Sequence, residues 1–163
     1  MARIATIARR SFLIGSAAIA GGVAFGFYKL NQAPANPLDA GTGQAALNPF
    51  IFIDGNGVTI ITPRAEMGQG VQTTLAALAA EELDIAWQDV RVLHGPPATA
   101  YYNAAMVGGM LPFKEYQMTG WQHMLAGQLD KAGKFLSLQV TGGSTSMRDG
   151  FDRLREAGAS ARE

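Results

Sequence analysis

Two glycine-rich segments, each directly before a helix-forming stretch, are the places in this sequence best suited to chemistry. One is MGQG at 67–70 and the other is TGGSTS at 141–146. Glycine leaves backbone N–H groups unobstructed, and the N-terminal end of a helix carries partial positive charge. Each segment is therefore suited to hold phosphate or another anion, and two together could hold both polar ends of one ligand, such as a dinucleotide.

Polar side chains add to these backbone groups. Gln69 donates and accepts hydrogen bonds through its amide, and Ser144 and Ser146 carry hydroxyl groups. A purely structural interpretation is also open, in which 67–70 is a tight turn and Ser146 with Asp149 forms a helix capping box. Neither segment matches GxxxxGK[ST] or GxGxxG, so spacing alone does not name a ligand.

The elements that must position these loops are readable from local patterns. Apolar runs at 50–53 and 58–61 flank DGNG at 54–57, which predicts a β-hairpin. Residues 71–83 are rich in Ala, Leu and Glu with apolar residues at helical spacing, which predicts a helix. We further expect a short strand at 90–92, an irregular helix within 113–129 and a final helix at 147–163. The predicted fold class is α+β, a hairpin and a further strand packed on helices.

The first thirty residues are typical of a targeting segment. Arg9 and Arg10 precede eighteen uncharged residues, which predicts a twin-arginine export signal over 1–30. An uncleaved membrane anchor is the alternative, because the uncharged run is long enough to span a bilayer. Either reading predicts a periplasmic location for the rest. Residues 31–48 show no hydrophobic period and are expected to be a linker, with the folded domain at 49–163.

Composition excludes several classes of protein. The chain has no cysteine, which excludes disulfide scaffolds and cysteine-ligated metal sites. Although 13 basic residues balance 13 acidic ones, four basic residues precede residue 30, so 30–163 carries a net charge of −4. We therefore expect no nucleic-acid partner. His94 and His123 lack metal-ligand spacing, the methionines form no array, and no GxSxG motif indicates a hydrolase.

Three stretches together resemble one known family. Residues 66–74 (EMGQGVQTT), 79–85 (AAEELDI) and 90–92 (VRV) resemble the molybdenum hydroxylases, the xanthine dehydrogenase and aldehyde oxidoreductase family. The likeness is greatest to exported large subunits of the isoquinoline 1-oxidoreductase (beta subunit) or membrane-bound aldehyde dehydrogenase type. Those subunits begin with a twin-arginine signal and carry a TGGS-type segment after MGQG, as this sequence does at 141–146.

The resemblance implies a cofactor and a set of residues around it. The cofactor would be a molybdopterin dinucleotide in the cytosine form, carrying molybdenum. Gln69 would contact it, Gly68 and Gly70 would let the backbone approach, and four residues would lie along its pterin or phosphates: Gly143, Ser144, Thr145 and Ser146. Complete members of the family hydroxylate aldehydes or N-heterocycles with oxygen from water. They pass the electrons to a two-cluster iron–sulfur subunit and often to a cytochrome c.

The sequence also departs from that family. The family's large subunit is several times longer, and neither its second glycine-rich loop nor its catalytic glutamate has a match here. We therefore expect no catalytic residue and no metal ligand in this chain, only a partial molybdopterin-binding domain at 49–163. The remaining large-subunit domains, on the same chain or a split subunit, are the expected partner. The final helix has no C-cap signal, which favours a front piece of something longer. A non-enzymatic, membrane-tethered periplasmic binding or scaffolding module and a truncated gene product are the alternatives.

Overall fold

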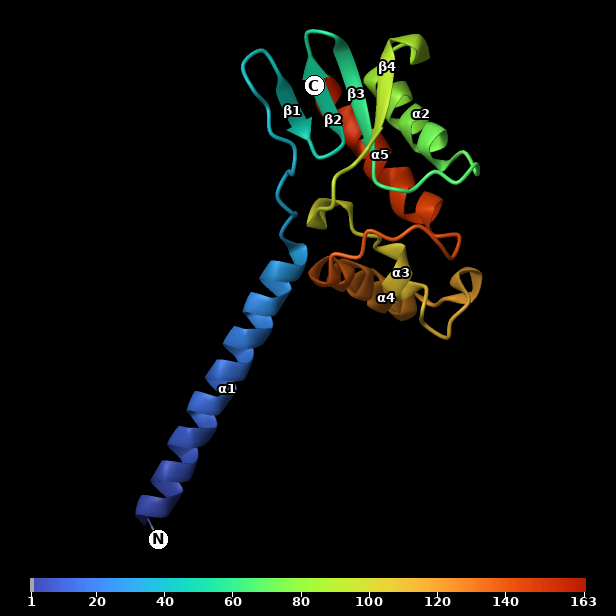
Figure 1. The fold of residues 1–163 in the computed structure, drawn as a ribbon. Coiled ribbons are helices and arrows are strands. Elements are labelled where there is room, and N and C mark those ends of the chain that lie inside the picture. The colour runs from blue at the N-terminus through green and yellow to red at the C-terminus, as the bar shows by residue number, and fades with distance from the viewer. Residues whose placement is uncertain (1) are drawn as a thin grey trace. The chain divides into compact units, whose positions relative to one another are not determined.

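The chain divides into two units, one ending at Gln32 and one spanning Ala33–Glu163. This computed structural model describes the backbone of residues 2–163 (Figure 1). Side chains are described from residue 12 onward. The side chains of Arg9 and Arg10, which form the predicted export signal, lie outside the described residues. Each unit is described by itself.

The first unit is a single helix, α1 (Ala2–Asn31). Its large apolar side chains, among them Phe12, Ile19 and Phe25, are exposed. From Phe12 to Asn31 the helix is long and apolar enough to cross a membrane. Signal sequences share that length and composition, so the helix agrees with both the predicted signal and the alternative of an anchor.

A four-stranded sheet organises the second unit, in the order β1 (Ala45–Asn48), β2 (Ile51–Asp54), β3 (Gly57–Thr62) and β4 (Val90–His94). β2 and β3 are antiparallel, and the pair Asp54 and Gly57 closes a two-residue turn, which confirms the predicted hairpin. β4 runs parallel to β3 because the connection between them crosses over through a helix. The predicted strand at 90–92 forms the first three residues of β4.

β1 lies inside the segment expected to be a linker. Its sequence, AALN, has no β-branched or aromatic residue, so nothing local predicts a strand. Side-chain hydrogen bonds of Asn48 stabilise the strand instead. Its side-chain oxygen accepts hydrogen bonds from the N–H groups of Phe50 and Ile51 at 2.9 and 3.0 Å. Its amide nitrogen donates to the Ala157 carbonyl at 2.9 Å. These contacts hold β1 at the edge of the sheet through an irregular register.

The helices of the second unit agree broadly with the sequence pattern. α2 spans the predicted residues, and α5 begins one residue earlier than expected. In place of an irregular helix within 113–129, α4 begins at Gly120, where Thr119 and Gln122 form a capping box. The fold class is α+β, as predicted. The helices are α2 (Val71–Leu83), α3 (Ala105–Gly108), α4 (Gly120–Ala132) and α5 (Ser146–Arg162), with single 3-10 turns at η1 (Trp87–Asp89), η2 (Thr99–Tyr101), η3 (Glu115–Gln117) and η4 (Gly133–Leu136).

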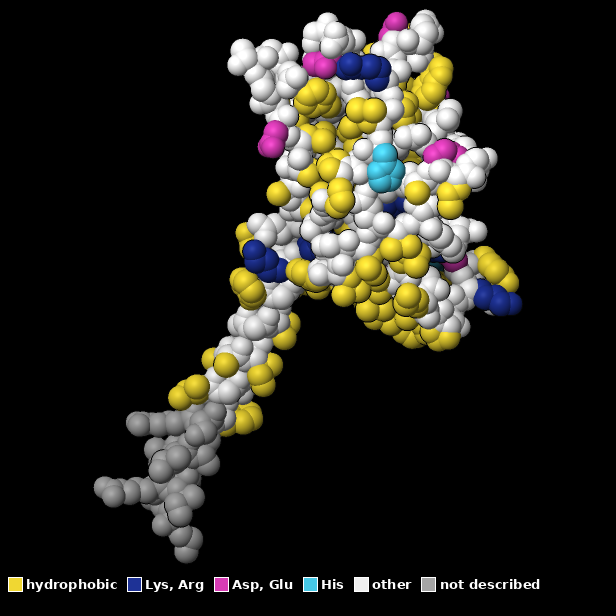
Figure 2. Space-filling view, in the orientation of Figure 1, with side chains coloured by type: hydrophobic (Ala, Val, Ile, Leu, Met, Phe, Trp, Pro, Cys, Tyr) yellow, Lys and Arg dark blue, Asp and Glu magenta, His cyan; other side chains and the backbone are white. Residues whose placement is uncertain are grey.

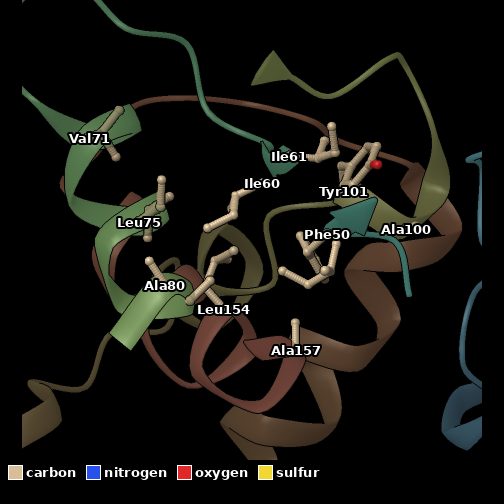
Figure 3. Close-up of a cluster of buried hydrophobic side chains, with 13 residues drawn as sticks. Phe50, Ile60, Ile61, Val71, Leu75, Ala80, Ala100, Tyr101, Leu154 and Ala157 are labelled. Atoms are coloured by element: carbon tan, nitrogen blue, oxygen red, sulfur yellow. The ribbon is translucent and has the colours of Figure 1, made fainter. Parts of the chain in front are cut away.

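The core lies between one face of the sheet and the pair α2 and α5 (Figure 3). Ile60 of β3, Leu75 of α2 and Leu154 of α5 are fully buried there. Burying each such side chain contributes about 1.5–3 kcal/mol. α2 and α5 approach closely because α5 carries glycine at the contact: a Cβ on Gly158 would lie 2.4 Å from the Ala79 carbonyl oxygen. The sheet and these two helices thus form the rigid base from which both glycine-rich loops emerge.

Candidate functional site

The two glycine-rich loops meet at one hollow, because α2 and α5 both begin there. The backbone N–H of Ala65 donates to the Thr141 hydroxyl at 2.7 Å, which joins the two loops directly. The hollow has a volume of about 400 Å³. Its lining comes from both loops and the first turns of both helices: Met67, Gln69, Val71, Thr74, Thr141, Gly142, Ser144, Ser146 and Met147.

The first loop, 66–70, is folded around the carboxylate of Glu66. This carboxylate accepts the N–H groups of Gly68, Gly70 and Gln72 at 2.8, 2.9 and 3.0 Å. Gly68 and Gly70 have φ of 92° and 76°, a left-handed conformation that suits glycine. Hydrogen bonds from backbone N–H groups, that of Gln72 first, lower the pKa of Glu66. The anion at the start of α2 is therefore the chain's own carboxylate.

Gln69 completes the same loop from the other side. Its side-chain nitrogen donates to the Ala65 carbonyl at 2.9 Å, and its side-chain oxygen accepts the Met67 N–H at 2.6 Å. An amide side chain offers two donor hydrogens and two acceptor lone pairs. One donor hydrogen and one acceptor lone pair of the Gln69 side chain therefore remain for a ligand, and Gln69 lines the hollow.

The second loop, 141–146, contains a tight turn. Gly143 and Ser144 have φ of 60° and 54°, and the Thr145 N–H donates to the Gly142 carbonyl at 3.2 Å. Positive φ at both central residues is typical of a type I′ turn, and it is uncommon for serine. This turn places Ser144 on the wall of the hollow, and Ser146 follows it there at the start of α5.

Thr145, in contrast, is turned into the protein. Its hydroxyl donates to the Gly142 carbonyl at 2.7 Å and accepts from the buried amide nitrogen of Asn103 at 2.8 Å. Of the seven residues expected to bind a ligand, three line the hollow, namely Gln69, Ser144 and Ser146. Gly68, Gly70 and Gly143 provide backbone conformation, and Thr145 supports its loop from below. Binding by these residues stays a prediction.

A buried network lies under both loops. Arg64 and Asp149 form an ion pair in which both side chains are fully buried. The Arg64 guanidinium also donates to the carbonyls of Tyr101 and Tyr102, and the Asp149 carboxylate accepts the Ala104 N–H at 2.8 Å. Burial lowers the pKa of Arg64, and the charge of Asp149 opposes this. The capping-box interpretation of Ser146 and Asp149 is wrong, because the Asp149 side chain is committed to this network.

Local sequence patterns do not reveal these supporting residues. Arg64 is a single base after Pro63, and Asp149 is a single acid in the first turn of a helix, where acids are common. Glu66 is a single acid directly before MGQG, a position that by type alone suits a ligand contact or a surface ion pair. Among the described residues it makes no ion pair and bonds backbone N–H groups instead. No cluster of three or more metal-ligating side chains occurs in that part of the chain.

Comparison with known proteins identifies the family. Residues 7–109, more than half of the chain, match the molybdopterin cofactor-binding domain. The chain belongs to this family. The match includes the first loop and ends before the second loop, whereas two relatives align along almost the whole chain.

Two curated relatives align with almost the whole chain. The chain is 29% identical to isoquinoline 1-oxidoreductase subunit beta of Brevundimonas diminuta over 160 residues, 96% of the chain. It is 31% identical to membrane-bound aldehyde dehydrogenase [pyrroloquinoline-quinone] of Gluconacetobacter polyoxogenes over 164 residues, 97% of the chain. In both cases it covers 16% of the relative's length. No solved structure matches.

Proposed function

We propose that this chain is the cofactor-binding portion of an exported molybdenum oxidoreductase, and that the hollow between its loops holds part of a molybdopterin dinucleotide, the cytosine form. One observation carries the proposal. Two loops that lie about seventy residues apart in the sequence are joined by the bond from Ala65 to Thr141 and line one hollow. Membership of the molybdopterin cofactor-binding domain family supplies the kind of ligand.

The residues of the hollow fit such a ligand. Its volume of about 400 Å³ is in the range of small-molecule sites. Met67, Val71 and Met147 give it apolar walls on which a flat ring system can lie. Ser144 and Ser146 offer hydroxyl donors at the positive end of α5, where a ligand's anionic groups are favoured.

On this proposal the seven residues take separate roles. Gln69 contacts the cofactor through its free donor and acceptor, and Gly68 and Gly70 let the backbone come close. Gly143 gives the second loop its turn, Ser144 and Ser146 hydrogen-bond the ligand, and Thr145 keeps the loop in place. When bound, the cofactor supplies the redox centre of the reaction. The chain's own residues bind it, orient it and cover it from water.

The reaction belongs to a larger assembly. The two relatives are named for an isoquinoline oxidoreductase and an aldehyde dehydrogenase, and this chain spans 16% of their length. We infer that the complete assembly hydroxylates an aldehyde or an N-heterocycle, and that the catalytic glutamate is in its other domains. Partners are those domains, a two-cluster iron–sulfur subunit and often a cytochrome c.

Two features of the chain agree with that assembly and its location. Figure 2 shows hydrophobic side chains gathered over the region of α4, where Trp121, Met124 and Phe135 are exposed. A surface of this kind is typical of a protein–protein contact. Export to the periplasm is favoured by the apolar helix α1, by the Arg9 and Arg10 pair and by the word membrane-bound in one relative's name. On this proposal α1 is either the export signal or an inner-membrane anchor.

Cofactor content tests the proposal. The chain is co-expressed with the remaining domains, and the purified assembly is assayed for molybdenum, for pterin and for pyrroloquinoline quinone, the group in the second relative's name. We expect molybdenum and pterin in the parent, a several-fold loss in Gln69→Ala and no loss in Gln128→Ala on α4. If the thermal unfolding temperature of Gln69→Ala equals that of the parent, the loss of cofactor reflects a lost contact and not a lost fold. An assembly that holds quinone, or no cofactor, contradicts the proposal.

A further inference from the structure

The Glu66 carboxylate lies where the sequence led us to expect the anion of a ligand. Its two oxygens accept three backbone N–H groups at 2.8–3.0 Å, from Gly68, Gly70 and Gln72. The side chain is exposed, and no described cation pairs with it. The first turn of α2 is thus capped by a carboxylate that comes from four residues before the helix N-cap, Gly70.

The three hydrogen bonds to the Glu66 carboxylate stabilise the conformation of the 66–70 loop. Hydrogen bonds to an ionised acceptor are about twice as strong as neutral ones, and the start of α2 adds favourable dipole charge. Gln69 makes two further hydrogen bonds within the loop. Its side-chain oxygen accepts from the Met67 N–H, and its side-chain nitrogen donates to the Ala65 carbonyl. With both side chains in place, hydrogen bonds close the backbone from 65 to 70 on itself, and Met67 and Gln69 line the hollow.

The same bonds keep other anions away. Glu66 is attached to the loop that it binds, so its effective concentration at these N–H groups is in the millimolar range or higher. A dissolved anion has to displace it to reach the same groups. Backbone N–H groups at 68 and 70, although unobstructed by side chains, are therefore not open to solution anions in this conformation.

We propose that Glu66 is a positioning residue: its carboxylate fixes the 66–70 loop so that Gln69 presents its free hydrogen-bonding groups to the hollow, and it keeps free anions off the Gly68 and Gly70 N–H groups. The link to ligand binding rests on the proposed function, whereas the effect on the loop does not. Glu66 acts through the loop, and the ligand is contacted by Gln69.

The chemistry of the carboxylate sets the variants that test this. Glu66→Gln keeps the length of the side chain and replaces one acceptor oxygen by an NH₂ group, which faces N–H donors and cannot bond them. Glu66→Ala removes the group and leaves the N–H groups open. Glu81→Gln is the matched control, because Glu81 is an exposed acid on α2, the helix whose first turn Glu66 caps.

The first experiment uses the full chain, ¹⁵N-labelled in detergent, without cofactor. We expect the amide hydrogens of Gly70 and Gln72 to exchange about tenfold faster or more in Glu66→Ala, which removes both acceptor oxygens, and at parent rates in Glu81→Gln. On titration with inorganic phosphate, the Gly68 and Gly70 amide resonances should shift in Glu66→Ala and stay fixed in the parent. Equal exchange in the parent and Glu66→Ala, or equal phosphate shifts in these two proteins, overturns the proposal.

The second experiment measures molybdenum and pterin in the co-expressed assembly. Several-fold less cofactor in Glu66→Gln, with parent content in Glu81→Gln, supports the positioning role. Equal content in Glu66→Gln and a loaded parent overturns it for ligand binding. If the parent assembly holds no cofactor while the exchange results are as expected, the proposed function fails and the role of Glu66 in the loop stands.

Discussion

Arg64 and Asp149, 85 residues apart in the sequence, form a fully buried ion pair beneath the two loops. Arg64 directly precedes the first loop, and Asp149 lies in the first turn of α5, which follows the second. Removing two charges from water costs several kcal/mol for each, and here the carbonyls of Tyr101 and Tyr102 and the Ala104 N–H satisfy further hydrogen-bonding groups of the pair. The relative placement of the loops therefore depends on this pair.

Breaking the pair should strongly destabilise the fold. We expect Asp149→Asn to lower the free energy of unfolding by about 3–5 kcal/mol, because it leaves Arg64 as a buried charge without its carboxylate partner. Arg64→Met should cost less, because Arg153 still pairs with Asp149 at 3.1 Å. Arg155→Ala, which removes a partly exposed ion pair with Glu82, should cost less than about 1 kcal/mol. Urea unfolding followed by circular dichroism measures all three. Similar losses for the buried and the exposed pair would contradict this role.

Two glycines in helices should respond to alanine in opposite directions. In Gly158→Ala of α5 the new Cβ would lie 2.4 Å from the Ala79 carbonyl oxygen, so α2 and α5 must separate, at a cost of about 1–3 kcal/mol. In Gly127→Ala of α4 no heavy atom lies within 4 Å, and the better helix propensity should add about 0.5–1 kcal/mol. The denaturant midpoints of Gly158→Ala and Gly127→Ala, each compared with the parent, test this prediction. A stabilised Gly158→Ala would show that the helices do not touch there.

Tyr101 should make stability depend on alkaline pH. Its hydroxyl donates to the Pro49 carbonyl at 2.5 Å, and burial raises its pKa to about 12. The unfolded value is about 10, so the folded state holds the proton more tightly. This contribution is complete below pH 10 and is lost as pH rises through 12. The free energy of unfolding should therefore fall more steeply between pH 10 and 12 in the parent than in Tyr101→Phe. Parallel curves would contradict this.

Ser144 should show a conflict between stability and binding. Its φ of 54° is costly for serine, so Ser144→Gly should raise the free energy of unfolding by up to about 1 kcal/mol. On the proposed function it should also lower the molybdenum and pterin content several-fold, because a hydroxyl is lost from the hollow. Ser137→Gly, at φ 48° after η4, is the control for cofactor content. A Ser144→Gly assembly with parent cofactor content excludes a role for that hydroxyl.

Local signals were sufficient for most of the fold. The DGNG turn between two apolar runs predicted β2 and β3, and the Ala- and Leu-rich stretch from Val71 predicted α2, because both elements are favoured by residues close together in the chain. β1 was missed since Asn48 and Ala157, 109 residues apart, stabilise it.

The site was predictable only in part. Glycine and serine content located both loops, and each helix that follows was recognised. Arg64 and Asp149 carried no signal, because their role depends on which segments the fold brings together. Glu66 has a local role, yet a carboxylate that bonds N–H groups two, four and six residues ahead has no fixed sequence pattern.

An experimental structure of the cofactor-loaded assembly tests the central claim most directly. We predict molybdopterin density in the hollow between the 66–70 and 141–146 loops, in contact with Gln69, Ser144 and Ser146, with the Glu66 carboxylate still bonded to its three N–H groups. Cofactor density bound outside this hollow, with these three side chains facing solvent or other protein, would contradict the account.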